Sequence, residues 1–199
     1  MHKPLSTGAT IGILGGGQLG RMLSVAAARL GFRSHIFEPG IGCPASHVAD
    51  QLTTASYTDT DALQRFAETV DVITYEFENI PTSALDVLEQ VATIRPGREA
   101  LRISQDRLTE KDFLNSLGLK TAPYAAIDDA PALGAALNAF GTAAILKTRR
   151  FGYDGKGQVR LQPDSDPQAA VADLAGQAAL LEGFVDFSHE VSVIGARGA

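Results

Sequence analysis

Cysteine and histidine are scarce in this chain of 199 residues. Cys43 is the only cysteine, so no intrachain disulfide can form and a zinc site with several cysteine ligands is excluded. The four histidines include no pair at ligand spacing, and His189-Glu190 is not followed by the second histidine of a zinc-binding H-E-x-x-H helix. The sequence therefore offers no zinc site of these types.

Long apolar runs and an excess of basic residues are also missing. No segment approaches the roughly 20 apolar residues of a membrane span, and the first apolar run is too short for a secretory signal. The formal net charge is −6 and the pI is about 5.2. This balance argues against a non-specific nucleic-acid binder, which needs a basic surface. We therefore expect a cytoplasmic protein that binds neither membranes nor nucleic acid.

The chain contains enough apolar residues for a hydrophobic core, since 45% of its residues are hydrophobic and 20% are charged. The first hundred residues alternate between short apolar runs and helical patterns. Such alternation predicts a Rossmann-like α/β fold, in which helices cover both faces of a parallel sheet. The expected strands are 10–14, 34–37, 71–77 and a short strand ending near 97, and the expected helices are 19–30, 60–69 and 82–91.

The helix expected over residues 19–30 has one apolar face. Its apolar residues recur at helical spacing, and Gly31 supplies a C-cap. The face comprises Leu19, Met22, Leu23, Ala26, Ala27 and Leu30.

After about residue 100 the pattern changes to one long charged helix, 99–117, followed by more strands than helices. We expect strands at 124–127, 143–147, 158–161, 178–185 and 190–194, and helices at 131–140 and 167–174. This half predicts a separate α+β domain. The predicted domain limits are 1–103 and 104–199.

A glycine-rich turn follows the first strand. Gly15, Gly17 and Gly20 match G-x-G-x-x-G, and the backbone N–H groups of such a loop at a helix N-terminus favour a phosphate or a carboxylate. Glu38 ends the second strand, where a dinucleotide-binding protein keeps its ribose-binding acid. An NAD site is one interpretation. The alternative is that the glycines only let the helix pack closely on its strand.

A second glycine-rich loop lies in AILKTRRFGYDGKGQVRL, residues 144–161. A strand delivers Lys147, and the loop that follows is basic and contains three glycines. Such a loop can fold over a polyphosphate and neutralise it. It is not a Walker A loop, because no Gly-Lys-Ser/Thr opens a helix. The alternative interpretation is a basic β-hairpin with a glycine turn.

The third informative stretch is LLEGFVDFSHEVSV, residues 180–193. Glu182 ends an apolar strand and Glu190 follows a short turn, so two carboxylates are expected near one strand pair. Ion-paired surface acids are the ordinary explanation for such a pair.

Together these stretches resemble the ATP-grasp carboxylate–amine ligases, most closely the N5-carboxyaminoimidazole ribonucleotide synthases of purine biosynthesis. GILGGGQLGRM at 12–22 and YEFENI at 75–80 resemble their first domain. QDRLTEK at 105–111, the second glycine loop and EGFVDFSHEVSVIGARG at 182–198 resemble the front part of their ATP-grasp fold. The combination is specific, whereas G-x-G-x-x-G alone is weak.

The resemblance implies roles for individual residues. Lys147, Tyr153 and Asp154 would carry the chemistry, and Gln18, Leu19 and Glu76 would face the ribonucleotide substrate. Glu182 to Val185 would line the adenine pocket, and Glu190 would bind the ribose hydroxyls. The residues implied to bind ATP are Arg107, Lys147, Gly152, Tyr153, Asp154, Gly155, Lys156, Gly157, Gln158, Glu182, Gly183, Phe184, Val185 and Glu190.

The resemblance also implies the reaction and its partners. ATP and bicarbonate would carboxylate 5-aminoimidazole ribonucleotide, and members of this family commonly form homodimers. Their magnesium ligands lie in a part of the family's sequence that corresponds to positions beyond Ala199, so no metal ligand is expected in this chain and the chain alone is expected to be inactive.

Three other interpretations stay open at this point. A related ATP-grasp ligase or a formate-using transformylase would share both glycine loops. A dinucleotide-binding module would rest on Gly15, Gly17, Gly20 and Glu38. A non-catalytic fragment that only dimerises would need neither loop.

Overall fold

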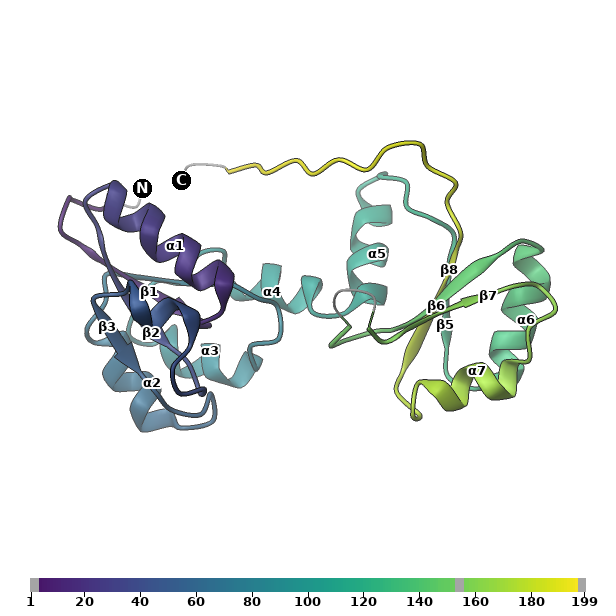
Figure 1. The fold of residues 1–199 in the computed structure, drawn as a ribbon, viewed down its shortest axis with the longest axis horizontal. Helices are drawn as coiled ribbons and strands as arrows, with labels where there is room; N and C mark the ends of the chain where they lie inside the picture. The colour runs from purple at the N-terminus through teal and green to yellow at the C-terminus, as the bar shows by residue number, and fades with distance from the viewer. Residues whose placement is uncertain (1–3, 153–155, 197–199) are drawn as a thin grey trace. The chain divides into compact units, whose positions relative to one another are not determined.

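The computed structural model describes residues 4–152 and 156–196. The chain divides into two compact units, the first ending at Arg102 and the second beginning at Ile103 (Figure 1). Within the described part of the chain, none of the helices combines the length and apolar character that crossing a membrane requires.

The first unit contains a four-stranded parallel sheet in the order β3-β2-β1-β4. Its strands are β1 (Thr10–Leu14), β2 (Arg33–Phe37), β3 (Gln51–Thr53) and β4 (Val72–Tyr75). Its helical elements are α1 (Gln18–Arg29), the 3-10 helix η1 (Pro44–His47), α2 (Thr60–Ala67), α3 (Thr82–Leu88) and α4 (Arg98–Ser104), which reaches the boundary. The predicted parallel α/β architecture is confirmed.

Alternate strand residues separate the two faces of this sheet. Leu14 and Phe37 pack against α2 and α3 in one buried cluster. Ile13 and Ile36, one position earlier in each strand, pack in a second cluster that includes Ala45 of η1. Figure 1 shows α1 on one side of the sheet and α2 and α3 on the other. Both faces are therefore covered, as a parallel sheet requires.

Helix α1 ends as predicted but presents a different face to the sheet. Gly31 has φ +80°, and the N–H groups of Gly31 and Phe32 donate to Ala28 and Ala27, which is a Schellman C-cap. The buried residues, however, are small: Gly20, Ser24 and Ala27.

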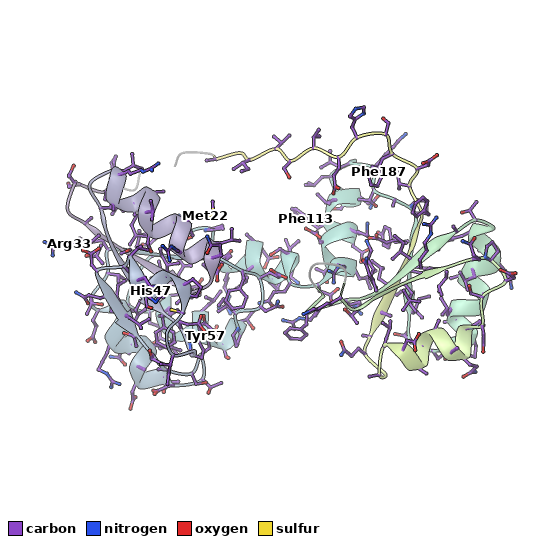
Figure 2. All side chains as sticks on the ribbon, viewed as in Figure 1. Met22, Arg33, His47, Tyr57, Phe113 and Phe187 are labelled. Carbon is purple, nitrogen blue, oxygen red and sulfur yellow. The ribbon has the colours of Figure 1, made fainter. Side chains whose placement is uncertain are left out.

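The predicted apolar face of α1 is largely exposed, with Met22 58% and Leu30 70% exposed. Figure 2 labels Met22 beside this helix. The reason is the close approach of α1 to the glycine turn. An ideal Cβ on Gly20 would lie 2.5 Å from the carbonyl oxygen of Gly15, so only a small-residue stripe fits there. The large apolar side chains consequently occupy the flanks and outer surface of the helix.

The second unit contains a four-stranded antiparallel sheet in the order β5-β8-β6-β7. Its strands are β5 (Tyr124–Ile127), β6 (Ala144–Thr148), β7 (Gln158–Leu161) and β8 (Ala179–Gly183). Its helices are α5 (Arg107–Ser116), α6 (Ala130–Phe140) and α7 (Pro167–Asp173). One sheet face packs Leu146 and Leu181 against α6 and α7. The predicted α+β class of this half is confirmed.

The single helix predicted over 99–117 is wrong, because the structure has α4 and α5 in its place. Asp106 lies between them with φ −128° and ψ 115°. Its carboxylate accepts hydrogen bonds from the N–H groups of Leu108 and Thr109, at 2.9 and 3.3 Å. An N-cap of this kind starts a new helix and leaves no continuous one.

The strand predicted over 190–194 is also wrong. The described residues after Gly183 are irregular, and Ile194 is 99% exposed. Its alternating apolar pattern has no neighbouring strand to pair with among the described residues, and a lone strand is not stable. The short strand expected before residue 97 is reduced to one parallel bridge between Ile73 and Ile94. The edge strand β3 was not predicted, because its three residues carry too little pattern.

The close packing at Gly20 gives a stability prediction. Replacing Gly20 with alanine should lower the free energy of unfolding by about 2 kcal/mol, because the new methyl group meets a backbone oxygen that cannot rotate away. Urea unfolding followed by circular dichroism measures this change. Gly97→Ala is the matched control in the same unit, since nothing lies within 4 Å of its added Cβ. Equal stability of the two variants would contradict the close approach.

Candidate functional site

In the first unit, carboxylates occupy the N–H groups of the glycine turn. The N–H of Gly16 donates to Glu38 at 2.8 Å, and the N–H of Gly17 donates to Glu76 at 3.0 Å. The other carboxylate oxygen of Glu38 accepts from the N–H of Gly40 at 2.9 Å. The sequence pattern predicts an anion-binding loop, and the anions in the structure are the protein's own side chains.

This arrangement argues against a dinucleotide site. A pyrophosphate on the turn would compete with two carboxylates for the same donors and would meet their negative charge. Burial, together with the charges of Glu38 and Glu76, raises the pKa of the nearby Tyr57 hydroxyl above its usual range. One oxygen of Glu38 accepts from Gly16 of the turn and the other from Gly40, two residues after Glu38, so both oxygens already have a backbone donor.

The residues expected to face the ribonucleotide lie around this turn. Gln18 and Leu19 open α1 directly after Gly17, and Glu76 follows β4 and accepts from Gly17. The structure thus brings these three residues together at the carboxyl ends of β1 and β4, where parallel sheets bind ligands.

In the second unit, Glu182 binds two lysines. Glu182 of β8 is opposite Ile145 in the antiparallel register, so Lys147 projects from the same sheet face two residues farther along β6. One carboxylate oxygen pairs with Lys147 and the other with Lys111 of α5, the latter at 2.7 Å. The side chains of Glu182, Lys111 and Lys147 are 12%, 14% and 23% exposed.

The two lysines determine the charge state of Glu182. Burial alone would raise the pKa of the Glu182 carboxyl, but hydrogen bonds and positive charge from Lys111 and Lys147 outweigh burial and lower it. The carboxyl is therefore ionised at neutral pH. With one carboxylate between two ammonium groups, the cluster carries a net positive charge.

The base of the second glycine loop is held by the start of α5. The guanidinium of Arg107 donates to the carbonyl oxygens of Thr148 and Gly152, both at 2.7 Å. Arg149 makes two hydrogen bonds with the carboxylate of Asp106, at 3.0 and 2.7 Å, and Arg150 donates to Gln105 at 2.9 Å. The sequence predicts that Arg107 contacts ATP. In the structure, its hydrogen bonds hold the two ends of the segment 148–152, with which the loop begins.

Two glycines of this loop approach Thr148 closely. Gly157 has φ +68°, and a Cβ on it would lie 2.7 Å from the Thr148 hydroxyl oxygen. A Cβ on Gly152 would lie 2.9 Å from the carbonyl oxygen of Lys156. Only glycine fits either position, so the loop closes tightly at its base. Lys156 and Gln158 are exposed, and the predicted residues Tyr153, Asp154 and Gly155 lie outside the described residues.

Of the other predicted residues, Gly183, Phe184 and Val185 lie at or directly after the end of β8, whereas Glu190 lies farther along the chain. Gly183 ends β8, and Phe184 and Val185 follow it. The N–H of Phe184 donates to Ala143 at 2.9 Å, which keeps this segment beside β6. Glu190 lies in the exposed irregular segment, so the structure does not place it in the strand pair that the sequence predicted.

Sequence reasoning missed Lys111 and the pair of Asp106 with Arg149. A signal for Lys111 was available, because it lies four residues after Arg107 and therefore on the same face of α5. Asp106 could have been recognised as an N-cap residue. The partner Arg149 comes from a distant strand end and leaves no local signal.

A candidate metal centre is not found in the described part of the chain: residues 4–152 and 156–196 contain no group of three or more His, Cys, Asp or Glu side chains placed to hold an ion.

Two family models match the chain, one over the part that contains the glycine turn and one over the part that contains the Lys147 cluster. Residues 8–105 match the family model for the ribonucleotide synthetase preATP-grasp domain, and residues 112–199 match the ATP-grasp domain. The chain belongs to the ATP-grasp family. In this family the parallel sheet of the first unit is the preATP-grasp domain, and the Lys147 cluster lies in the ATP-grasp domain.

Curated and solved relatives agree with this assignment. The chain is 56% identical over 195 residues to an N5-carboxyaminoimidazole ribonucleotide synthase of Brucella melitensis, covering 97% of this chain and 54% of that protein. A solved ADP complex of an N5-carboxyaminoimidazole ribonucleotide synthetase is 39% identical, with a TM-score of 0.88 over 94% of this chain and 50% of that one.

A third relative, from Aspergillus clavatus, was solved with ADP and 5-aminoimidazole ribonucleotide. It is 27% identical, with a TM-score of 0.80 over 92% of this chain and 48% of that one. The chain spans about half the length of the curated relatives it matches.

The pair of Asp106 with Arg149 gives a second prediction. Asp106→Ala should lower the free energy of unfolding of the second unit by about 2 kcal/mol, because it removes both an N-cap and a partly buried charge pair. Asp129→Ala is the matched control: Asp129 caps α6 through Ala132 at 2.8 Å, so its loss should cost only about 1 kcal/mol. Chemical unfolding measures both, and equal losses would contradict a stabilising pair.

The same pair predicts a pH dependence. Burial would raise the pKa of Asp106, but hydrogen bonds from Arg149, Thr109 and Leu108 lower it below its usual value. A depressed carboxyl pKa adds stability above the unfolded pKa of about 3.9, and the gain is lost as pH falls through the folded value. The stability difference between the wild type and Asp106→Asn should therefore shrink below about pH 4. A difference that stays constant between pH 7 and pH 3 would contradict this.

Proposed function

We propose that the second unit binds ATP through the Lys147 cluster and the glycine loop. The observation that supports this most directly is the net positive charge of the cluster formed by Lys111, Glu182 and Lys147. The glycine loop follows Lys147, and Arg107 holds its base by hydrogen bonds. A polyphosphate needs such a site, and a matching ATP-grasp domain supplies the fold. The proposed limits of the two domains are 1–103 and 104–199.

Each ATP-site residue has a proposed role. Lys147 neutralises phosphate oxygens, and the loop 152–158, which contains Tyr153 and Asp154, closes over them. The segment 182–185 lines the adenine pocket. It comprises the last two residues of β8 and the two residues that follow them. Glu190 binds the ribose hydroxyls, which requires the segment after Gly183 to take another course than the exposed, irregular one described above.

We propose that the first unit binds 5-aminoimidazole ribonucleotide through Gln18, Leu19 and Glu76. The glycine turn already carries carboxylates on its N–H groups, so this end of the sheet offers hydrogen-bond acceptors. The amine and the ribose hydroxyls of the ribonucleotide suit such acceptors, whereas its phosphate, like a pyrophosphate, has to lie away from the carboxylates of Glu38 and Glu76. The relative solved with this ribonucleotide supports the choice.

The whole protein is proposed to carboxylate this ribonucleotide with ATP and bicarbonate. An oxygen of bicarbonate attacks the γ-phosphorus, the bond to ADP breaks, and carboxyphosphate forms. The substrate amine then attacks the carboxyl carbon of carboxyphosphate, or carbon dioxide released from it. By either route inorganic phosphate leaves and the amine loses a proton. Positioning and charge neutralisation supply most of the catalysis in such a transfer, and magnesium would add positive charge that neutralises the phosphates.

Two further properties follow from the family resemblance and stay predictions: the protein acts in the cytoplasm and forms a homodimer. Light scattering coupled to size-exclusion chromatography measures the mass in solution. A mass of one chain would contradict the homodimer for this chain.

The nucleotide proposal predicts selective binding of ADP. Calorimetric titration of the 199-residue chain with ADP and magnesium should show binding, and Lys147→Ala should weaken it about tenfold to a hundredfold, because hydrogen bonds to charged groups contribute about 1.5–3 kcal/mol. Lys120→Ala, on an exposed residue of the same unit, removes an equal charge and should leave the affinity unchanged.

NAD is the matched competitor in this experiment. The turn formed by Gly15, Gly16 and Gly17 should bind no NAD, since Glu38 and Glu76 occupy its donors. NAD binding that persists in Lys147→Ala and disappears in a Gly17 variant would show that the first turn is a dinucleotide site. The proposed function would then be wrong. For a full-length relative, phosphate release with bicarbonate but not formate separates carboxylation from formyl transfer.

A further inference from the structure

Glu182 pairs with two lysines, although one ammonium group would balance the charge of its carboxylate. Lys111 approaches one carboxylate oxygen at 2.7 Å from α5, and Lys147 binds the other from β6. Both contacts lie on the sheet face opposite the one that packs against α6 and α7, because Glu182 and Lys147 alternate with the core residues Leu181 and Leu146.

In the proposed ATP site, nucleotide binding would change the partners of this carboxylate. For Lys147 to neutralise a phosphate, its ammonium must give up part or all of its bond to Glu182. A half-buried carboxylate that loses its only partner is strongly destabilised, because neither water nor another charge replaces that partner. Glu182 by itself would therefore hold Lys147 away from the nucleotide.

We propose that Lys111 is a positioning residue that keeps Glu182 paired and thereby releases Lys147 for the polyphosphate. This inference rests on the proposed ATP site. Lys111 itself needs no contact with the nucleotide, since its effect passes through Glu182.

The surroundings of the two lysines favour this division of roles. Lys111 is the less exposed of the two, and its ammonium lies 5.7 Å from the centre of the Tyr124 ring. The hydroxyl of Tyr124 donates to Asp112, the next residue of α5, at 2.7 Å. Tyr124 is also opposite Glu182 in the register of β5 and β8. Helix α5 is thus fixed beside Glu182, whereas the more exposed Lys147 is the lysine able to move.

The start of α5 is also anchored. Asp106 caps the helix and binds Arg149, and Arg107 binds the carbonyl oxygens at the loop base. These contacts fix the helix turn from which Lys111 projects. Lys111 is therefore carried by an anchored helix, and its bond to Glu182 is separate from the bond that Lys147 makes.

A double-mutant cycle on the full chain tests the inference, with ADP and magnesium as the probe and calorimetry as the readout. Lys111→Met should weaken ADP binding about tenfold, because Lys147 then becomes the only partner of Glu182. Lys111→Arg keeps the positive charge and should stay within about threefold of the wild type. Lys120→Met, at an exposed position of the same unit, controls for the lost charge.

Coupling between the residues separates positioning from general damage. In a Glu182→Gln background there is no carboxylate to hold Lys147, so adding Lys111→Met should change the affinity less than about twofold. Thermal unfolding of each variant without nucleotide checks that the second unit is folded.

The outcomes are distinct. If the wild type binds ADP in a Lys147-dependent way but Lys111→Met binds equally well, the inference is wrong and the ATP site stands. An equal loss from Lys111→Met in both backgrounds would also overturn the inference, because the effect would not pass through Glu182. Absence of ADP binding by the wild type would overturn the proposed function, and the inference with it.

Discussion

The pairing of one half-buried carboxylate with two lysines is the interaction on which the second unit's site depends. Glu182 must stay ionised and paired, because a buried charge without a partner is costly. This requirement joins α5, β6 and β8 on one face of the antiparallel sheet. It also leaves a net positive charge beside the glycine loop, where we propose that a polyphosphate binds.

The two glycine-rich segments look alike in sequence but have opposite electrostatic character in the structure. In the first, backbone N–H groups are taken by Glu38 and Glu76, so the turn presents acceptors and negative charge. In the second, backbone carbonyls are taken by Arg107, and the residues beside them are basic. Glycines provide the close approach in both cases. The charged side chains that meet each segment decide which ligand it suits.

Local patterns were enough to predict most of the fold. Alternating elements gave the parallel sheet, and β1, β5 and β7 have their predicted limits. The errors occurred where a distant contact decides the structure: Asp106 interrupts a helical pattern, the segment 190–194 lacks a partner strand among the described residues, and α1 turns its small residues toward the sheet. In the site, Lys147 and Glu182 were predicted separately, but their common bond to Lys111 depends on how α5 packs, which no local pattern encodes.

Residue-resolved NMR of the chain during titration with ADP and magnesium tests the central claim most directly. The account predicts that the amide signals of Gly152, Gly157 and Phe184 shift with ADP concentration, together with the side-chain signals of Lys147. The amides of Gly16 and Gly17 should not move, since carboxylates hold them. Shifts confined to Gly16 and Gly17, with Lys147 unchanged, would contradict the assignment of the nucleotide to the second unit.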